Sequence, residues 1–341
     1  MVLAVKFICK IMLLLDSIYV NMGGGLSLLK YLVETLQEKG IRFRLLVDTR
    51  ADGQFPNVAD QVVLSPSESS RSKFYKAFPQ DVTSVFCFGN VPPPIKLNVP
   101  VYTYFHNINM LTLADCRGWK QLVKFWLKRQ YIRLRKKNTD SWFVQTSNTA
   151  NELIKNLRVP KAIVDLYPFY RPPQNIVSGT NKRMDYIFVG DDSGSKGHNE
   201  LLDAWELLHN KGIDRTLHLT VSSGAPSYEK IQNLIKNGVC IQNHGIIPMT
   251  EVFALYARCK ATVYPSRNES FGLGLVEAME SGCDVIGSDL PFIHAICEPS
   301  EVFNRDSPES IADSVAMYES NGNDTRQLVT NMVGKLVNNI Q

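Results

Sequence analysis

Long hydrophobic runs and a strong charge of either sign are both absent from the sequence of 341 residues. No stretch approaches the roughly 20 uncharged apolar residues that a membrane-spanning helix needs. The largely apolar segment Val2–Leu15 contains Lys6 and Lys10 and is followed by no small-residue cleavage site, so it does not resemble a signal peptide. The formal net charge of +4 argues against a general nucleic-acid-binding protein, and we predict no nucleic-acid partner.

Cysteines are few, and no two of them form a Cys-x-x-Cys pair. The seven positions are irregularly spaced and their number is odd, which argues against a disulfide framework and a structural zinc site. Reduced, mostly buried thiols are the simplest interpretation, and we expect a cytoplasmic protein. Hydrophobic residues make up 44% and charged residues 21% of the chain, which is globular rather than disordered composition.

Apolar runs of strand length alternate with helix-length patterns through the first half of the chain. The helix pattern Ser27–Glu38 closes at Gly40, and the serine-rich stretch Ser65–Ser72 is predicted to be an exposed loop. This alternation is typical of a parallel sheet with helices on its faces. The expected strands are Lys10–Asp16, Phe43–Asp48, Val82–Phe88, Val101–Phe105 and Ser141–Gln145.

Clustered prolines in Pro168–Gly179 indicate a linker, after which the alternation restarts. Because single cores rarely grow beyond about 250–300 residues, two domains are expected. We predict an α/β domain over residues 1–170, a second α/β domain over 171–325, and a C-terminal helix over 326–341 that packs back on the first domain. The elements expected after the linker are the strands Tyr186–Gly190, Leu217–Ser222, Val239–Gln242, Ala261–Tyr264 and Asp284–Gly287 and the helices Asn199–Asn210, Tyr228–Asn237, Met249–Arg258 and Leu273–Ser281.

The segment Pro265–Met279 is the strongest functional signal. It follows an apolar strand and opens a helix, where free N–H groups attract an anion and where Gly272 and Gly274 let a ligand approach the backbone. Glu277 follows Glu269 by eight residues, a spacing that on a helix returns to roughly the same face. Two such carboxylates could grip both ends of an extended polar ligand. The alternative is that both are solvated glutamates near a helix start, where acids are favoured. This alternative explains Glu269 easily, but it explains less well why Glu277 lies inside an otherwise apolar run.

This segment resembles the E-x7-E motif of family 4 glycosyltransferases, the retaining enzymes of GT-B fold. Its continuation through Asp289 is similar to the family's EAMA-G-PVI-SD stretch. The resemblance covers most of the second half in the family's order, and it also includes Phe188–Gly190, Lys196–Gly197, Gly245–Pro248 and Leu255–Tyr256. It implies the α/β architecture called GT-B, with two Rossmann-like domains facing across a cleft.

The resemblance also implies roles for individual residues in binding a nucleotide-sugar donor. Glu269 would contact the donor sugar near the reacting centre, Lys196 would neutralise the diphosphate, and Glu277 would hold the ribose hydroxyls. Ile247 would lie beside the base. The backbone N–H groups of Phe271 and Gly272 would bind sugar and phosphate. Further contacts with the donor would come from Gly190, Ser270 and Leu273.

One position departs from the family pattern. Where the family often has an arginine as a second diphosphate cation, this sequence has Asp191, followed by Asp192. An anion there should repel a diphosphate. A non-catalytic glycosyltransferase-like subunit that binds nucleotide or a partner therefore stays an alternative, although the intact Glu269 and Glu277 argue against it.

Two features of the first half fit the same chemistry. Three glycines in Met22–Leu26 expose the backbone near a helix start, which suits a phosphate, although a tight strand–helix turn is the simpler interpretation. The resemblance implies that Gly24 and Gly25 face the donor phosphates. His106 follows a strand at the sheet edge where α/β proteins bind ligands, and the resemblance implies that it approaches the donor sugar. Asp48 ends the next strand along the chain, so a dinucleotide-binding site is not excluded, although the signal for it is weak.

Basic and aromatic residues are interleaved in Arg117–Lys137, which has nine Lys or Arg residues and no acid. On a helix, residues 119, 122, 123 and 126 share one apolar face, and residues 120, 124 and 128 form a basic row beside it. This pattern favours contact with an anionic membrane surface and hints at a lipid-linked acceptor. A surface helix whose apolar face packs on its own domain explains the pattern about as well.

The motifs together predict a retaining glycosyltransferase that moves a sugar from a UDP-, GDP- or dTDP-sugar to a glycan or lipid-linked acceptor in bacterial surface polysaccharide synthesis. The resemblance implies no metal, and no other cofactor is expected. We expect a cytoplasmic protein, and the Arg117–Lys137 pattern adds peripheral contact with the inner face of the cytoplasmic membrane. A GT-B nucleotide-sugar epimerase is another alternative. Front-face attack and double displacement both stay open as routes to retention, and for Glu269 we favour orientation and charge stabilisation of the sugar.

Overall fold

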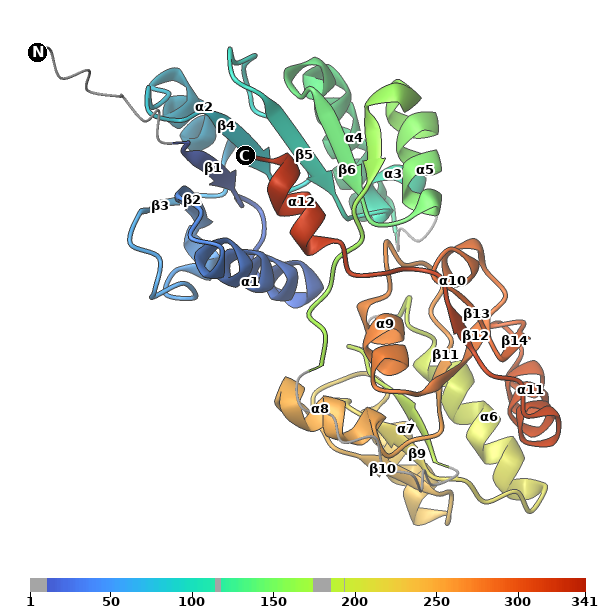
Figure 1. Cartoon of the computed structure of the whole chain (residues 1–341). Helices are drawn as coiled ribbons and strands as arrows, with labels where there is room; N and C mark the ends of the chain where they lie inside the picture. Colours follow the sequence, from blue (N-terminus) through green and yellow to red (C-terminus); the bar gives the residue numbers. More distant parts are fainter. Residues whose placement is uncertain (1–10, 114–117, 174–184, 193) are drawn as a thin grey trace, which may run out of the picture. The chain divides into compact units, whose positions relative to one another are not determined.

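The chain folds into two compact units, which are described separately (Figure 1). The computed structural model describes residues 11–113, 118–173, 185–192 and 194–341. Unit 1 comprises Met1–Phe169 together with Asn331–Gln341, and unit 2 comprises Tyr170–Thr330. The linker predicted over Pro168–Gly179 runs across the boundary at residue 170, and its part from residue 174 onward lies outside the described residues.

Unit 1 contains a seven-stranded sheet in its described residues, with the order β3-β2-β1-β4-β5-β6-β7 and parallel pairing throughout. The central strands are buried along their whole length because helices cover both sheet faces, as their near-continuous apolar sequences predict. The strands are β1 Leu13–Asp16, β2 Phe43–Asp48, β3 Gln61–Leu64, β4 Ser84–Cys87, β5 Val101–Phe105, β6 Ser141–Val144 and β7 Val164–Leu166.

The helices of unit 1 include one from the end of the chain. Figure 1 shows α12 beside α1, against which it packs. The Ser84 hydroxyl donates to the Ile340 carbonyl at 2.7 Å, which ties the C-terminal segment to β4. The helices are α1 Gly23–Glu38, α2 Glu68–Lys76, α3 Asn109–Thr112, α4 Trp119–Arg135, α5 Ser147–Leu157 and α12 Val333–Asn339, with 3-10 turns at Thr49–Ala51, Lys136–Asn138 and Lys161–Ile163.

Unit 2 repeats the same design, with a parallel sheet of order β10-β9-β8-β11-β12-β14 among its described residues. A short antiparallel pair, β13 with β15, lies outside this sheet. The strands are β8 Tyr186–Phe188, β9 Leu217–Leu219, β10 Ile241–Asn243, β11 Ala261–Tyr264, β12 Asp284–Ser288, β13 Cys297–Glu298, β14 Glu301–Phe303 and β15 Arg326–Gln327. The helices are α6 His198–Asn210, α7 Tyr228–Lys236, α8 Met249–Tyr256, α9 Leu273–Glu280, α10 Pro291–His294 and α11 Pro308–Asn321.

Strand order reverses once in each sheet, between β1 and β4 in unit 1 and between β8 and β11 in unit 2. In open α/β sheets the loops at the carboxyl ends of two such strands turn toward opposite faces, and ligands bind between them. The segments after β1 and β4, and those after β8 and β11, are therefore where binding residues are expected.

Three details of the sequence prediction are wrong. Ser65–Ser72 is not a loop throughout, because α2 begins at Glu68, where the Ser67 hydroxyl accepts the Ser70 N–H at 3.2 Å and caps the helix. The first helix begins at Gly23 rather than Ser27, so the glycines form its first turn. The C-terminal helix is confined to Val333–Asn339, because Arg326–Gln327 pairs as β15 and the Asn331 side chain accepts the Val333 N–H.

Candidate functional site

Two loops of unit 2 meet at the switch point between β8 and β11 through one ion pair. Lys196 follows β8, Glu269 follows β11, and Lys196 Nζ lies 2.5 Å from Glu269 Oε1. The Tyr264 hydroxyl donates to the same oxygen at 3.3 Å. The side chains of Lys196 and Glu269 are 21% and 15% exposed, so both can reach a ligand while their stems are held by the protein. The structure thus brings together two residues that the sequence predicted to act on one donor.

A glycine makes this approach of the two loops possible. Gly197 has φ +75°, and a Cβ there would lie 2.5 Å from the Pro265 carbonyl oxygen. Any other residue would clash with the backbone that leads to Glu269. The Arg267 N–H also donates to the Ser195 carbonyl at 2.7 Å, so the loops are joined by backbone as well as by side chains. Lys196 is therefore held at its place rather than free on the surface.

The segment Glu269–Gly272 precedes α9 instead of forming part of it. Gly272 has φ +73° and stands at the N-cap, where no side chain of the described residues caps the helix. The spacing of Glu269 and Glu277 is consequently not a helical one, which corrects the geometric argument from sequence. The first-turn N–H groups of α9, starting at Leu273, point along the helix axis and suit an anion. Ser270 is partly exposed beside them, and the Phe271 ring is buried against Tyr170.

Glu277 is a buried acid within α9, with 9% of its surface exposed. Burial raises its pKa to about 7. The buried Tyr256 hydroxyl, which has no hydrogen-bond partner among the described residues, has a pKa raised by burial and also by the charge of Glu277. A Cβ at Gly274 would lie 3.4 Å from this hydroxyl, so the glycine leaves backbone accessible next to both groups. An acid buried at such a cost is a frequent mark of a functional site.

The two acids after β8 have different surroundings. The Asp192 carboxylate accepts the Ser227 N–H at 2.6 Å and lies 3.4 Å from the buried ring of His198, so it holds the loop before α7. Burial lowers the pKa of His198 despite the opposing charge of Asp192. Asp191 is exposed. Gly190, whose Cβ position would face the Phe188 ring and the Lys196 stem, keeps the loop close to the sheet.

The Gly-x-x-Pro turn after β10 lies beside a cavity of about 260 Å³. Ile247 is partly exposed there, and His244, Glu251 and Arg258 also line the cavity. His244 Nε2 lies 2.9 Å from His218 Nδ1, so His244 is fixed by a ring partner from β9. Ile247, Ala254 and Leu255 give this cavity apolar wall surface beside the charged side chains of Glu251 and Arg258.

Gly25, which follows β1, and His106, which follows β5, come together at the carboxyl edge of the unit 1 sheet. A Cβ on Gly25 would lie 3.2 Å from His106 Cε1, so the glycine lets the ring approach α1 closely. The Asn90 side chain accepts the His106 backbone N–H at 2.7 Å. Burial lowers the His106 pKa to about 4, which keeps the imidazole neutral near pH 7. Gly24 is exposed in the same first turn of α1, whose N-cap lacks a side-chain hydrogen bond.

Asp48 does not form a dinucleotide site. Its buried carboxylate takes two hydrogen bonds from the Arg50 guanidinium, at 2.9 and 2.6 Å, and accepts the Tyr19 N–H at 3.1 Å. Burial opposes ionisation, but these bonds hold the Asp48 pKa below its usual value. With its oxygens so engaged, Asp48 supports the loop after β1 instead of binding a ribose.

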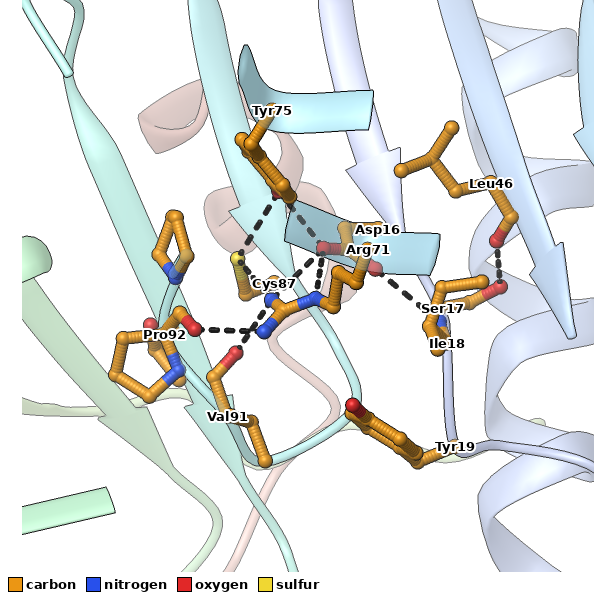
Figure 2. Close-up of polar contacts among 12 residues, drawn as sticks. Asp16, Ser17, Ile18, Tyr19, Leu46, Arg71, Tyr75, Cys87, Val91 and Pro92 are labelled. Carbon is orange, nitrogen blue, oxygen red and sulfur yellow. Dashed lines mark hydrogen bonds and ion pairs between the residues drawn. The ribbon is translucent and has the colours of Figure 1, made fainter. Parts of the chain in front are cut away.

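A buried ion pair at the end of β1 went unnoticed in the sequence (Figure 2). Arg71 of α2 donates through Nε to Asp16 at 2.8 Å, and the Tyr75 hydroxyl donates to the same oxygen at 2.7 Å. Arg71 also donates to the Val91 and Pro92 carbonyls, at 2.8 and 2.7 Å. Such a pair, 55 residues apart in the sequence, gives no local signal except the lone acid that ends an apolar strand.

Among the residues that the structure describes, no group of three or more His, Cys, Asp or Glu side chains is placed to hold a metal ion. None of the helices in that part of the chain has the length and hydropathy of a membrane-spanning segment.

Comparison with known proteins identifies the second half of the chain. Residues 174–332 match the family model described as glycosyl transferases group 1. The chain therefore carries a group 1 glycosyltransferase domain. This confirms the family resemblance predicted from the Glu269 and Glu277 segment.

Relatives and solved structures agree with this assignment. The serotype-specific mannosyltransferase WbdA of Escherichia coli is 33% identical over 147 residues, which are 40% of this chain but only 18% of that protein. The uncharacterized glycosyltransferase MJ1178 of Methanocaldococcus jannaschii is 29% identical over 57% of this chain and 50% of its own. This chain thus spans less than a fifth of the first of these relatives.

The sucrose-phosphate synthase structure from Thermosynechococcus elongatus matches with a TM-score of 0.72 at 14% identity, covering 92% of this chain and 90% of that one. At that identity the likeness shows the fold alone. It confirms the predicted GT-B fold with its two Rossmann-like domains.

Replacing Glu277 by Gln should change stability in a pH-dependent way. Folding raises the Glu277 pKa from 4.5 to about 7. The free energy of unfolding therefore falls as pH rises from about 4.5 to about 7, because Glu277 ionises more easily in the unfolded chain. Glu277→Gln removes this penalty and should increase the free energy of unfolding by roughly 1–3 kcal/mol more at pH 8 than at pH 5. Urea unfolding at both pH values measures the difference.

The matched control is Glu229→Gln on the exposed side of α7, which should shift stability equally at both pH values. If Glu277→Gln behaves like this control, then Glu277 is not a buried acid with a raised pKa.

Proposed function

We propose that this protein is a retaining glycosyltransferase that uses a nucleotide-sugar donor. The observation that carries the proposal is the Lys196–Glu269 ion pair at the β8–β11 switch point, next to the open N-terminus of α9. A cation, a carboxylate and free backbone N–H groups thus converge where a Rossmann-like sheet binds its ligand. The group 1 glycosyltransferase domain over residues 174–332 supports the same chemistry.

The ion pair suggests how a donor would be held. The diphosphate would compete with Glu269 for Lys196, and its remaining charge would be met by the first-turn N–H groups of α9. Glu269, released from Lys196, would accept hydrogen bonds from hydroxyls of the sugar. Glu277, buried further along α9, would accept hydrogen bonds from the ribose hydroxyls.

Catalysis would then be largely electrostatic. The bond between the anomeric carbon and the diphosphate oxygen breaks, and the charge on the leaving oxygen is stabilised by Lys196 and by α9. The acceptor hydroxyl oxygen bonds to the anomeric carbon and its proton passes to the leaving diphosphate, which gives retention by front-face attack. We propose that neither a metal nor another cofactor takes part.

The relatives narrow the donor and acceptor that we propose. WbdA is named a serotype-specific mannosyltransferase, and RfbU of Salmonella typhimurium, 34% identical over 74 residues, is named an O-antigen chain mannosyltransferase. A solved neighbour, the pneumococcal O-GlcNAc transferase GtfA, is titled as a complex with UDP and GlcNAc. We therefore propose transfer of a hexose, with mannose the first to test, to a glycan or lipid-linked acceptor of a bacterial surface polysaccharide.

Removing the Glu269 carboxylate should slow transfer strongly without unfolding the protein. With a GDP-mannose donor and a polyprenyl diphosphate-linked sugar as acceptor, Glu269→Ala should lower kcat by about 10²–10³, the usual loss for one electrostatic group of a site. Product formation by chromatography measures the rate, and the melting temperature checks the fold. The control Glu229→Ala, on the exposed side of α7, should retain wild-type kcat. Full activity in Glu269→Ala would remove Glu269 from the mechanism.

We also propose that α4 contacts an anionic membrane surface at the inner face of the cytoplasmic membrane. The apolar face of α4 does not pack on the core of its own unit. Ile132 is the only buried residue of α4 among those described, and the apolar residues of the predicted face are exposed. They are Trp119 72%, Leu122 45%, Val123 42% and Trp126 45%. Exposed Lys120 and Lys124 flank this face, which gives it the combination that binds headgroups and acyl chains together.

Charge reversal on α4 should weaken binding to anionic vesicles. Each Lys near the surface contributes about 1 kcal/mol, so the double variant Lys120→Glu, Lys124→Glu should bind phosphatidylglycerol vesicles at least tenfold more weakly. Cosedimentation measures the partition, and pure phosphatidylcholine vesicles should bind neither protein. The matched variant Lys155→Glu, Lys161→Glu, exposed elsewhere in unit 1, should bind like wild type. Equal loss in both variants would mean that net charge, and not α4, decides binding.

A further inference from the structure

Unit 1 has an apolar cavity that none of the assigned donor residues line. It has a volume of about 330 Å³, which is within the range of about 300–1,000 Å³ found for ligand sites. Its walls come from the ends of β1 and β4, from α3 and from α4, at the sheet edge where His106 also lies. The lining residues are Tyr19, Glu68, Gly89, Val91, Met110, Leu127, Lys128 and Tyr131.

The walls of this cavity are held rigidly by the buried network at the end of β1. Figure 2 shows Arg71 extending from α2 to the carbonyl oxygen of Val91, and its guanidinium lies 6.0 Å from the centre of the Tyr19 ring. Tyr19 has φ +82° and its hydroxyl donates to Glu68 at 3.2 Å. The cavity is therefore preformed, so a ligand would not have to order its walls.

A glycine in the wall keeps the space open. A Cβ at Gly89 would lie 2.0 Å from the Ile18 carbonyl oxygen, so the two loops touch through backbone alone. Any side chain would push apart the loops that follow β1 and β4. The close approach of these two loops forms the wall of the cavity that faces α4.

The open side of the cavity is both apolar and cationic. Leu127 lines the cavity and is also 55% exposed, so the cavity is continuous with the exposed apolar surface of α4. Lys128 lines it next to Leu127. Partial burial lowers the Lys128 pKa, and the nearby charges of Lys124 and Arg50 lower it further, which shows that cations gather at this rim. An anion beside the rim would relieve their repulsion.

We propose that this cavity binds the first isoprenoid units of a prenyl phosphate-linked acceptor, with the phosphate at Lys128. The proposal deepens the proposed function, on which it rests, by naming the acceptor class. An apolar chain fits the walls formed by Val91, Met110 and Leu127, and a phosphate complements Lys128 and Lys124 at the rim. A free sugar matches the cavity poorly because much of its lining is apolar and the Glu68 carboxylate already accepts a hydrogen bond from the Tyr19 hydroxyl.

Titration calorimetry with farnesyl phosphate, without any donor, tests the proposal on the full chain. Wild type should bind farnesyl phosphate saturably at one site, farnesol at least tenfold more weakly, and inorganic phosphate not measurably. Dihexanoyl phosphatidylglycerol distinguishes a bilayer lipid from an acceptor lipid and should bind at least tenfold more weakly than farnesyl phosphate. All probes are used below their micelle concentrations.

Leu127→Glu should weaken farnesyl phosphate binding at least tenfold, because it places a carboxylate at the cavity entrance. The matched control is Leu134→Glu, which introduces the same charge two turns along the same face of α4 at a position 81% exposed and outside the cavity. It should bind within twofold of wild type. Melting temperatures establish that both variants fold.

Equal affinity in Leu127→Glu and wild type would overturn the proposal, as would equal loss in the two variants or phosphatidylglycerol binding as tight as that of farnesyl phosphate. Absence of farnesyl phosphate binding to wild type would overturn it too. Failure of the proposed function shows separately, as a protein that no nucleotide sugar stabilises while farnesyl phosphate still binds.

Discussion

The reversal of strand order between β8 and β11 is the constraint on which the proposed donor site depends. It turns the following loops toward opposite faces of the sheet, so that Lys196 and Glu269, 73 residues apart, can meet over the space between. Gly197 permits this contact, since a side chain there would strike the Pro265 carbonyl. In unit 1, Gly25 after β1 and His106 after β5 also meet at the carboxyl edge of the sheet. One sheet design, used twice, thus brings residues of separate loops together in each unit.

The acids around the proposed diphosphate site differ in how their charge is balanced. Without a donor, Glu269 is neutralised by Lys196 and Asp192 is held by the Ser227 N–H, whereas Asp191 is exposed. Glu277 is different, because it is buried, no salt bridge joins it to a cation among the described residues, and burial raises its pKa to about 7. A ligand whose hydroxyl groups donate hydrogen bonds to Glu277 would offset the cost of burying this carboxylate.

The sequence was sufficient for the fold class and for most strands near the sites, because periodicity and glycine position report directly on a parallel α/β sheet. The family resemblance also assigned Glu269 and Lys196 to one site, and the structure places the two side chains in contact. The spacing of Glu269 and Glu277 did not help, since the segment before Gly272 is not helical. The sequence did not reveal α2, whose serine cap resembled a loop, or the Asp16–Arg71 pair. Contacts between distant buried residues leave no periodic trace, so the cavity that they shape was equally invisible.

Ligand-induced thermal stabilisation by UDP-, GDP-, dTDP- and ADP-sugars, each with and without EDTA, tests the central claim most directly. A ligand at 100 times its Kd adds about 2.7 kcal/mol of stability, enough to raise Tm visibly. The account predicts that one nucleotide class raises Tm, that EDTA leaves the shift unchanged, and that Glu277→Ala removes it. No shift with any nucleotide sugar would contradict it and favour a non-catalytic subunit, and a shift abolished by EDTA would contradict the metal-independent site.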